Sequence, residues 1–387
     1  MKTSKKHIVL RCLFLTYALC ILHCAIAQQE VKPASCGEFE AKILFGSVLP
    51  HYSYMNYLSE TYQKGLALHY TVSSKKITDY DAIWKFPAYG VGVRHITMGN
   101  AEKLGNLSML YAVFNGRFYK KYTRVAPYYQ INTGLAYAHK SMKKSLYNTA
   151  VSSPISFFAA INCGVQIHIY KGSFAKLGIE LEHISNGKTT TPNLGLNSLL
   201  LTASYKHLFV RKPAIRDFSK PEIKNHRINL TASGFYKTDD FVTEKKYFTS
   251  VFSAEYEWLS NAYWWGLQAG GDYFYDRSIG ALKPTVAPKK YMDVGIHAGA
   301  FVKYSHLVLL LHMGRYIGAT TQNADFYTCV GLRYEWERLF ANVSLRAHAA
   351  TAQSIEMGVG YKIKMSSRNP PKRNFKKIKV DHKTQDE

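Results

Sequence analysis

Residues 157–185 read FFAAINCGVQIHIYKGSFAKLGIELEHIS. Apolar and polar residues alternate through two segments of this stretch, Phe157–Tyr170 and Ala175–Ser185, and the short sequence Lys171-Gly172-Ser173 separates them. Because successive side chains of a strand point to opposite faces, this alternation predicts a hairpin with one apolar face. Each segment is longer than the roughly five or six residues usual in soluble sheets, and its length suits a tilted strand that crosses a membrane.

The same pattern recurs about sixteen times along the chain. In the first half the segments are Ala41–Leu49, Gly65–Val72, Ala88–Ile96, Leu107–Arg117, Val125–Tyr137, Phe157–Tyr170, Ala175–Ser185 and Asn197–His207. The second half repeats the scheme from His226 to Lys364. We therefore predict an all-β fold, an antiparallel transmembrane β-barrel of about sixteen strands.

The connections between these segments alternate in length. Links such as Pro50–Lys64 and Ala138–Ile155 are long, whereas Lys171–Ser173 and Glu337–Arg338 are short enough for tight turns. Long loops at one end and tight turns at the other are typical of outer-membrane barrels, in which the tight turns face the periplasm. The alternation therefore indicates an outer-membrane protein.

The stretch Phe209–Asn225 contains two prolines and divides the segments into two groups of about eight. It is either a periplasmic link within one barrel or a linker between two eight-stranded barrels. Two barrels need four sealing edges instead of two, so we favour one barrel and keep two as the alternative. We expect residues 28–208 to form the first half, 209–225 the link, 226–365 the second half, and 366–387 a basic disordered tail.

The N-terminus predicts export. Lys2, Lys5 and Lys6 precede an apolar stretch that ends near Ala25-Ile26-Ala27, which is the pattern of a signal peptide over residues 1–27. An apolar content of 47% excludes a disordered protein, and the absence of an apolar run of roughly 18 residues excludes a bundle of membrane helices. The net charge of +24 belongs to an exported chain, so we expect no nucleic-acid partner.

The cysteines and histidines do not predict a metal site. After removal of the signal peptide, Cys36, Cys163 and Cys329 remain, an odd number without a C-x-x-C spacing. The 15 histidines are scattered singly and suggest positions on strand surfaces rather than metal ligands. We therefore expect no disulfide framework, no metal and no cofactor.

Residues 177–207 read LGIELEHISNGKTTTPNLGLNSLLLTASYKH and contain the candidate chemistry. His183 and Ser185 are two apart, so on a strand they project from the same face, where an imidazole can activate a hydroxyl. Glu180 and Glu182 fall on the opposite face and do not easily orient His183. The alternative is that H-x-S is ordinary alternation before an Asn-Gly turn, and the residues by themselves leave both interpretations open.

The stretch EHISNG…PNLGLN resembles the lipid A 3-O-deacylase (PagL-type) family of outer-membrane barrels, also called acyloxyacyl hydrolases. A weaker similarity precedes it at Tyr89-Gly90-Val91-Gly92 and Gly99-Asn100, and the resemblance covers roughly residues 40–208. It implies catalytic residues on the lipid-facing wall of an eight-stranded barrel. It also implies a carboxylic ester hydrolase whose partner is lipid A, or lipopolysaccharide, in the outer leaflet.

The resemblance also implies roles for individual residues. Ser185 would be the nucleophile, His183 the general base, and Asn186 and Asn193 would lie at the oxyanion hole. The family carries its orienting acid twelve residues after the serine, where this chain has Asn197. An amide can hold the imidazole tautomer but cannot stabilise imidazolium as a carboxylate does. Either Asn197 orients His183 at some loss of rate, or an acid from elsewhere does so, or activity is lost.

Two functions follow as hypotheses. The first is an outer-membrane esterase that removes an acyl chain from lipid A or a related acylated glycolipid, with Lys188 placed to meet a phosphate. The second is a non-enzymatic barrel, porin-like, structural or adhesive, that retains the motif as a relic. Lysines in such loops are more often simply solvated, and the sequence does not indicate an oligomeric state.

Overall fold

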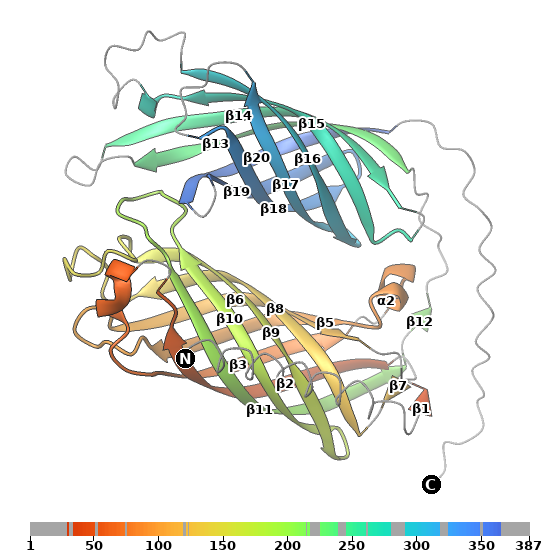
Figure 1. The fold of residues 1–387 in the computed structure, drawn as a ribbon. Helices are drawn as coiled ribbons and strands as arrows, with labels where there is room; N and C mark the ends of the chain where they lie inside the picture. Colours follow the sequence, from red (N-terminus) through yellow and green to blue (C-terminus); the bar gives the residue numbers. More distant parts are fainter. Residues whose placement is uncertain are drawn as a thin grey trace, which may run out of the picture.

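A computed structural model describes residues 29–30, 34–50, 53–73, 76–118, 121–122, 124–213, 215–216, 225–238, 245–260, 262–279, 291–317, 324–348 and 351–364. The predicted signal peptide and the predicted tail lie outside the described residues. Within the described chain, sixteen long strands form two closed barrels of eight strands each (Figure 1). The predicted all-β barrel architecture is thus confirmed, and the two-barrel alternative replaces the single barrel that we favoured.

The first barrel closes by pairing its last strand with its first. Its strands are β2 (Ala34–Val48), β3 (Gln63–Ser73), β5 (Ala88–Thr97), β6 (Asn106–Arg117), β8 (Val125–Ala138), β9 (Ile155–Tyr170), β10 (Ser173–Ser185) and β11 (Leu196–Pro213). β11 pairs antiparallel with β2 from Ser198↔Val48 to Pro213↔Ala34, so it extends into the segment predicted as the link.

The second barrel closes in the same way. Its strands are β13 (His226–Thr238), β14 (Lys246–Leu259), β15 (Trp265–Asp276), β16 (Met292–Tyr304), β17 (Leu307–Ile317), β18 (Phe326–Trp336), β19 (Leu339–His348) and β20 (Thr351–Lys364). β13 pairs with β20. The single-barrel prediction was wrong because the terminal strands of each half seal each other, which leaves no edge for the other half to pair with.

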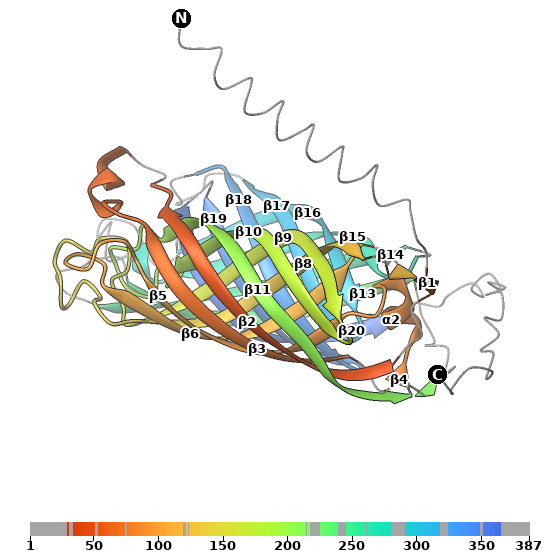
Figure 2. The same ribbon diagram turned by 90° about the horizontal axis from the view of Figure 1, so that it is seen from below.

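The remaining elements are short and lie outside the two barrels. They are β1 (Gln29–Glu30), β4 (Lys76–Ile77), β7 (Lys121–Tyr122), β12 (Ile215–Arg216), the 3-10 helix η1 (Ser53–Leu58) and the helix α2 (Asp79–Ile83). η1 and α2 lie at opposite ends of the first barrel (Figures 1 and 2). No helix in the described part of the chain is long and apolar enough to span a membrane.

Side chains alternate between the outer wall and the lumen, as the sequence pattern predicts. On β10, Leu177, Ile179 and Leu181 are exposed on the outer wall, whereas Glu180 and Glu182 are buried in the lumen. An apolar outer wall and a polar interior are the arrangement of a barrel in a bilayer. His183 has the parity of the apolar, lipid-facing residues.

The lumen of the first barrel is filled with paired charges. Arg94 on β5 donates from Nη2 to Glu180 Oε1 at 2.5 Å and also pairs with Glu182. Lys42 on β2 lies 3.5 Å from the other oxygen of Glu180. An eight-stranded barrel is just wide enough for its interior side chains to fill it, so this lumen is a packed interior rather than a channel.

An apolar cluster closes the first barrel beneath its long loops. Leu58 from η1, Ile96 from β5 and Ile184 from β10 are each 0% exposed, and Leu196 from β11 is 1% exposed. Ile184 and Leu196 are paired across β10 and β11. This packing holds the loop-side ends of β10 and β11 in place, and those two strands carry the motif identified in the sequence.

The two barrels contact each other at both ends. Near α2, Tyr304 donates its hydroxyl to Asp81 Oδ1 at 2.6 Å, and Trp84 donates its indole N–H to the Lys303 carbonyl at 3.0 Å. Near the long loops, Thr238 donates its hydroxyl to the Thr189 carbonyl at 2.8 Å. The barrels lie side by side in Figure 1.

Candidate active site

β10 and β11 position His183 on the outer wall of the first barrel. His183 lies directly opposite Asn197 in the pairing of the two strands. Its ring Nδ1 lies 2.7 Å from Asn197 Oδ1. With Nδ1–H donating to this amide oxygen, the lone pair of the neutral imidazole is on Nε2, which is the form that acts as a base.

Ser185 ends β10 on the same face as His183. Its Oγ accepts hydrogen bonds from Asn193 Nδ2 at 2.8 Å and from the Gly187 backbone N–H at 3.1 Å. The loop that contains these donors shields Ser185, which is 6% exposed, whereas His183 remains exposed. Both contacts use lone pairs of Oγ, so the hydroxyl hydrogen is available for a further acceptor.

The backbone of Gly195 lies close to the side chains of both His183 and Ser185. A methyl group in place of its hydrogen would lie 3.2 Å from His183 Cε1 and 3.7 Å from Ser185 Cβ. The residue has a φ of +74°, a conformation that favours glycine. His183 and Ser185 therefore border the same space beside this backbone, and a larger residue would intrude on the imidazole.

The loop after Ser185 is held by the side chain of Asn186. Its Nδ2 donates to Ser152 Oγ at 2.8 Å and to Thr190 Oγ1 at 2.7 Å, and its Oδ1 accepts from the Lys188 N–H at 2.9 Å. Its side-chain amide is therefore committed to the loop. The family resemblance implied that Asn186 and Asn193 lie at the oxyanion hole, and the structure brings the amide of Asn193 to Ser185 Oγ.

Sequence reasoning missed the backbone N–H of Gly187. This donor reaches Ser185 Oγ because Gly187 turns the chain with a φ of +61°. Asn193 is oriented by the same loop, since its Oδ1 accepts from the Asn186 backbone N–H at 3.1 Å and its Nδ2 then faces Ser185. The Asn-Gly pair is a turn signal in the sequence, but it does not reveal which atoms the turn presents.

The carboxylates nearest to His183 in the sequence do not orient its ring. Glu180 and Glu182 point into the lumen and pair with Arg94, as their parity in the sequence predicts. Asn197 supplies the oxygen that contacts Nδ1 instead. The imidazole is thus held by an amide at the position where the resembled family has an acid.

Lys188 lies at the seam between the barrels. Its Nζ is 3.4 Å from Gln353 Oε1 on β20, and its carbonyl accepts from the Thr238 N–H at 3.2 Å. A methyl group on Gly187 would lie 2.3 Å from Ile355 Cγ1, so the loop rests against the second barrel. The loop after Ser185 therefore contacts both barrels.

A second serine on the outer wall also contacts histidines. Ser108 Oγ lies 2.9 Å from His95 Nδ1 and 2.9 Å from His139 Nε2. Proximity of serine and histidine is thus not specific to one place on this barrel. Ser185 differs in that two amide donors contact its Oγ, and this pair of serines provides a matched comparison.

Two family models match the chain. Residues 64–206 match the lipid A 3-O-deacylase (PagL) family, and residues 226–365 match the acyloxyacyl hydrolase C-terminal domain. The chain belongs to the lipid A 3-O-deacylase (PagL) family. This membership confirms the resemblance read from the motif, and it places the protein among outer-membrane hydrolases that act on lipid A. The first matched region covers the first barrel from β3 to most of β11, and the second covers the second barrel.

Comparison with solved structures gives distant similarities. Neisserial surface protein A has a TM-score of 0.32 and 14% identity, covering 45% of this chain and 97% of its own. A double mutant of the Rhodopseudomonas blastica porin has a TM-score of 0.18 and 10% identity, covering 85% of this chain and 100% of its own. No curated protein matches the chain.

Proposed function

We propose that the protein is an outer-membrane esterase that removes an acyl chain from lipid A or a related acylated glycolipid, with Ser185 as the nucleophile. The observation that carries the proposal is the arrangement around Ser185 and His183. The imidazole Nδ1 lies 2.7 Å from Asn197 Oδ1, and two N–H donors reach Ser185 Oγ beside it. Family membership supplies the reaction class.

Acylation begins when Ser185 Oγ attacks the carbonyl carbon of the substrate ester. His183 Nε2 takes the hydroxyl proton as the C–O bond forms, and the carbonyl oxygen becomes an oxyanion. When the tetrahedral intermediate collapses, the bond to the sugar oxygen breaks and His183 returns the proton to that oxygen. The products of this half-reaction are an acyl-serine and a glycolipid with a free hydroxyl.

Asn193 Nδ2 and the Gly187 N–H are the proposed oxyanion donors. Both groups donate hydrogen bonds to Ser185 Oγ, at 2.8 and 3.1 Å. This position is close to where the carbonyl oxygen of the substrate arrives during attack. Donors held in place in this way stabilise the charge without having to reorganise, and losing one costs about 10²–10³ in rate. Asn186 supports them by fixing the loop through Ser152 and Thr190.

Deacylation uses a water molecule and the same base. His183 removes a proton from water, the hydroxide attacks the acyl-serine, and collapse of the second tetrahedral intermediate returns the proton to Ser185 Oγ. The released product is a fatty acid. His183 is exposed at the wall, so water and lipid both have access to its ring.

The location of the site fits a lipid substrate. His183 shares its face of β10 with the exposed residues Ile179 and Leu181, so the acyl chains of a membrane lipid can approach the site along the outer wall. The substrate need not enter the lumen. Lys188, three residues after Ser185, is half-buried at the seam between the barrels, and we propose that it contacts a phosphate of the headgroup.

Mass spectrometry of lipid A from cells that express the protein tests this function. We expect wild-type cells to yield lipid A that lacks one acyl chain, and cells expressing Ser185→Ala or His183→Ala to yield intact lipid A. Ser108→Ala is the matched control, because Ser108 also contacts histidines on the outer wall. It should process lipid A like the wild type.

The remaining outcomes decide between the two functions considered. Identical lipid A from all four strains, with equal amounts of folded barrel in the membrane, would leave the non-enzymatic barrel as the function. Processing that depends on Ser108 instead of Ser185 would place the reaction at the other serine. Heat-modified migration in gels verifies that each variant is folded.

A further inference from the structure

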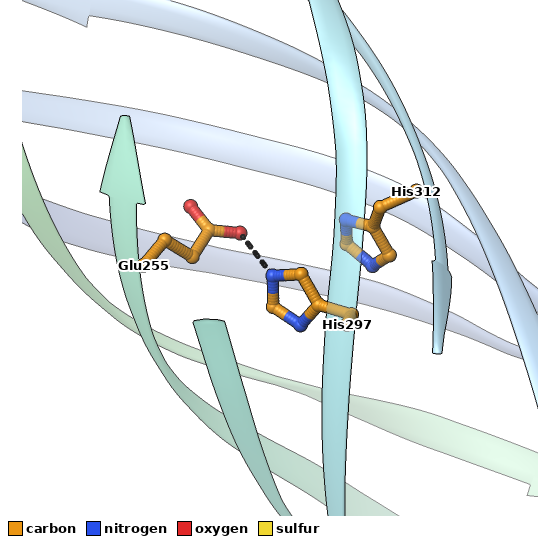
Figure 3. A group of neighbouring side chains, drawn as sticks. All are labelled: Glu255, His297 and His312. Atoms are coloured by element: carbon orange, nitrogen blue, oxygen red, sulfur yellow. Dashed lines mark ion pairs between the residues drawn. The ribbon is translucent and has the colours of Figure 1, made fainter. Parts of the chain in front are cut away.

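Two histidines and a glutamate meet in the lumen of the second barrel, away from the site described above. Glu255 comes from β14, His297 from β16 and His312 from β17, and one ligand atom from each lies within 4.8 Å of the others. The three residues are 4%, 4% and 8% exposed. Figure 3 shows the carboxylate and the two imidazoles gathered at one place.

His297 is held with one ring nitrogen directed into the cluster. Its Nδ1 lies 2.7 Å from Asp272 Oδ2, which leaves Nε2 toward Glu255. Nε2 is buried and has no hydrogen-bond partner among the described residues. A carboxylate on the second nitrogen of a histidine is the usual partner of a metal-binding imidazole, because it fixes the tautomer and raises ligand basicity.

The distance between Nε2 and the nearest carboxylate oxygen fits an ion better than a hydrogen bond. His297 Nε2 and Glu255 Oε1 are 3.6 Å apart. Two ligands about 2.0–2.1 Å from a tetrahedral ion are about 3.4 Å from each other. Gly270 on β15 leaves the space for this imidazole, since a methyl group there would lie 3.1 Å from Nε2.

The lumen beside the cluster has room for an ion with water. A cavity of about 30 Å³ is lined by Glu255, Asp272 and His312 among other residues. This volume exceeds the roughly 10–15 Å³ that one water needs on the same measure. The rings of His297 and His312 are stacked with centroids 4.1 Å apart, and His312 Nδ1 lies 2.9 Å from Gln268 Nε2, so binding requires the His312 ring to turn toward the ion.

We propose that Glu255, His297 and His312 bind a divalent transition-metal ion, with water completing its coordination. Two imidazoles and one carboxylate form a donor set that suits zinc and iron(II). Asp272 acts as the outer partner that orients His297. The other oxygen of Glu255 accepts from Arg333 at 2.7 Å, so Oε1 is the oxygen directed to the ion.

The competing explanation is a protonated His297 that pairs with Glu255 and Asp272 and binds no metal. Zinc titration separates the two. The full chain, purified in detergent and stripped with a chelator, is titrated with Zn²⁺ by calorimetry, and with Co²⁺ by visible absorption. We expect one tight site per chain and the ligand-field bands of Co²⁺ bound by nitrogen and oxygen ligands.

Variants assign the site. His312→Gln should weaken Zn²⁺ binding by at least about 100-fold, and Asp272→Asn by about 10–100-fold through the loss of an outer partner. His69→Gln is the matched control, because His69 is a buried histidine in the lumen of the first barrel, 2.8 Å from the Tyr111 hydroxyl. It should leave binding unchanged.

Two results would overturn the proposal. One is the absence of a tight site in the folded wild-type protein, which would support the protonated His297. The other is equal binding by the wild type and His312→Gln, which would assign the metal to histidines elsewhere, such as the outer-wall pair His95 and His139. If His312→Gln fails to fold, Asp272→Asn, which keeps all three ligands, makes the same assignment in its place.

Discussion

Asn197 is the residue at which this chain departs from the pattern of its family, and its chemistry sets the expected rate of ester hydrolysis. An amide oxygen 2.7 Å from His183 Nδ1 fixes the neutral tautomer that the base requires. It carries no charge, so it adds little to the stability of the imidazolium that forms as Ser185 attacks. The structure therefore describes an oriented base with a weak electrostatic partner.

Substitutions at Asn197 measure how much its contact with His183 contributes to kcat. We expect Asn197→Glu, which restores the acid, to raise kcat about tenfold, and Asn197→Leu, which removes the contact with Nδ1, to lower kcat about 10²-fold. Release of fatty acid from lipid A in mixed micelles gives both values. Wild-type activity in Asn197→Leu would show that another group orients His183.

Substitution of Gly195 tests whether kcat depends on the space between the side chains of His183 and Ser185. Gly195→Ala places a methyl group 3.2 Å from His183 Cε1 at a φ of +74°, so it both strains the backbone and displaces the ring. Because a misplacement of about 1 Å can cost about 10²-fold, we expect kcat to fall by about that factor. Fatty-acid release in the same micelles measures the loss.

Gly105→Ala is the control for backbone strain. Gly105 has a φ of +66°, and a methyl group there would lie 3.1 Å from the flexible side chain of Lys140. Gly105→Ala should strain the backbone as Gly195→Ala does, but without contacting His183. Its kcat should therefore equal that of the wild type. An equal loss in both glycine variants would trace the effect to folding instead of the site.

Strand β10 shows how one element serves two functions. Its outward-facing residues include His183 and Ser185, whereas its inward-facing residues Glu180 and Glu182 form ion pairs with Arg94. Both carboxylates and the guanidinium are buried, so each depends on the others for its charge compensation. The ion cluster thus fixes the strand from inside the barrel while the site operates outside.

Arg94→Gln tests this anchoring. The substitution leaves two carboxylates buried without their cation, and we expect the free energy of unfolding to fall by about 3–5 kcal/mol. Urea unfolding in lipid vesicles, followed by tryptophan fluorescence, measures the change. Lys103→Gln removes an exposed pair with Glu60 and should have little effect. Equal midpoints for both variants would mean that the lumen cluster does not stabilise the barrel.

At the level of elements, the sequence predicts strands better than loops. Alternation with a period of two gives the strands and places His183 and Ser185 on one face, because strand geometry is local. The donor Gly187 N–H depends on a positive φ and on Ser152, which is far away in the sequence and holds Asn186. The cluster of Glu255, His297 and His312 was missed for the same reason, since its members come from three strands.

At the level of the whole molecule, the number of barrels could not be obtained from local pattern. The strand segments are compatible with one barrel or two, and the choice depends on whether β11 pairs with β2 or with β13. The structure pairs β11 with β2 and β13 with β20. Closing each half produces two narrow, filled interiors instead of one wide channel.

The filled interiors predict that the protein does not form an open pore. Arg94 with Glu180 occupies the first lumen, and Arg333 with Glu255 and Glu257 occupies the second, at 2.7 and 2.6 Å. We expect planar bilayers containing the purified protein to show no steady single-channel current. A porin prepared in the same way is the positive control, and a large, stable conductance would contradict the two-barrel arrangement.

The central claim is that Ser185 is an activated nucleophile on the acyl-chain side of the wall, and covalent labelling tests it most directly. A long-chain alkyl fluorophosphonate accepts attack by serine Oγ with loss of fluoride, so mass spectrometry of the digested protein identifies the modified residue. We predict a single adduct on the peptide that contains Ser185, strongly reduced in His183→Ala. A folded wild-type protein that stays unlabelled, or that is labelled at Ser108, would contradict the account.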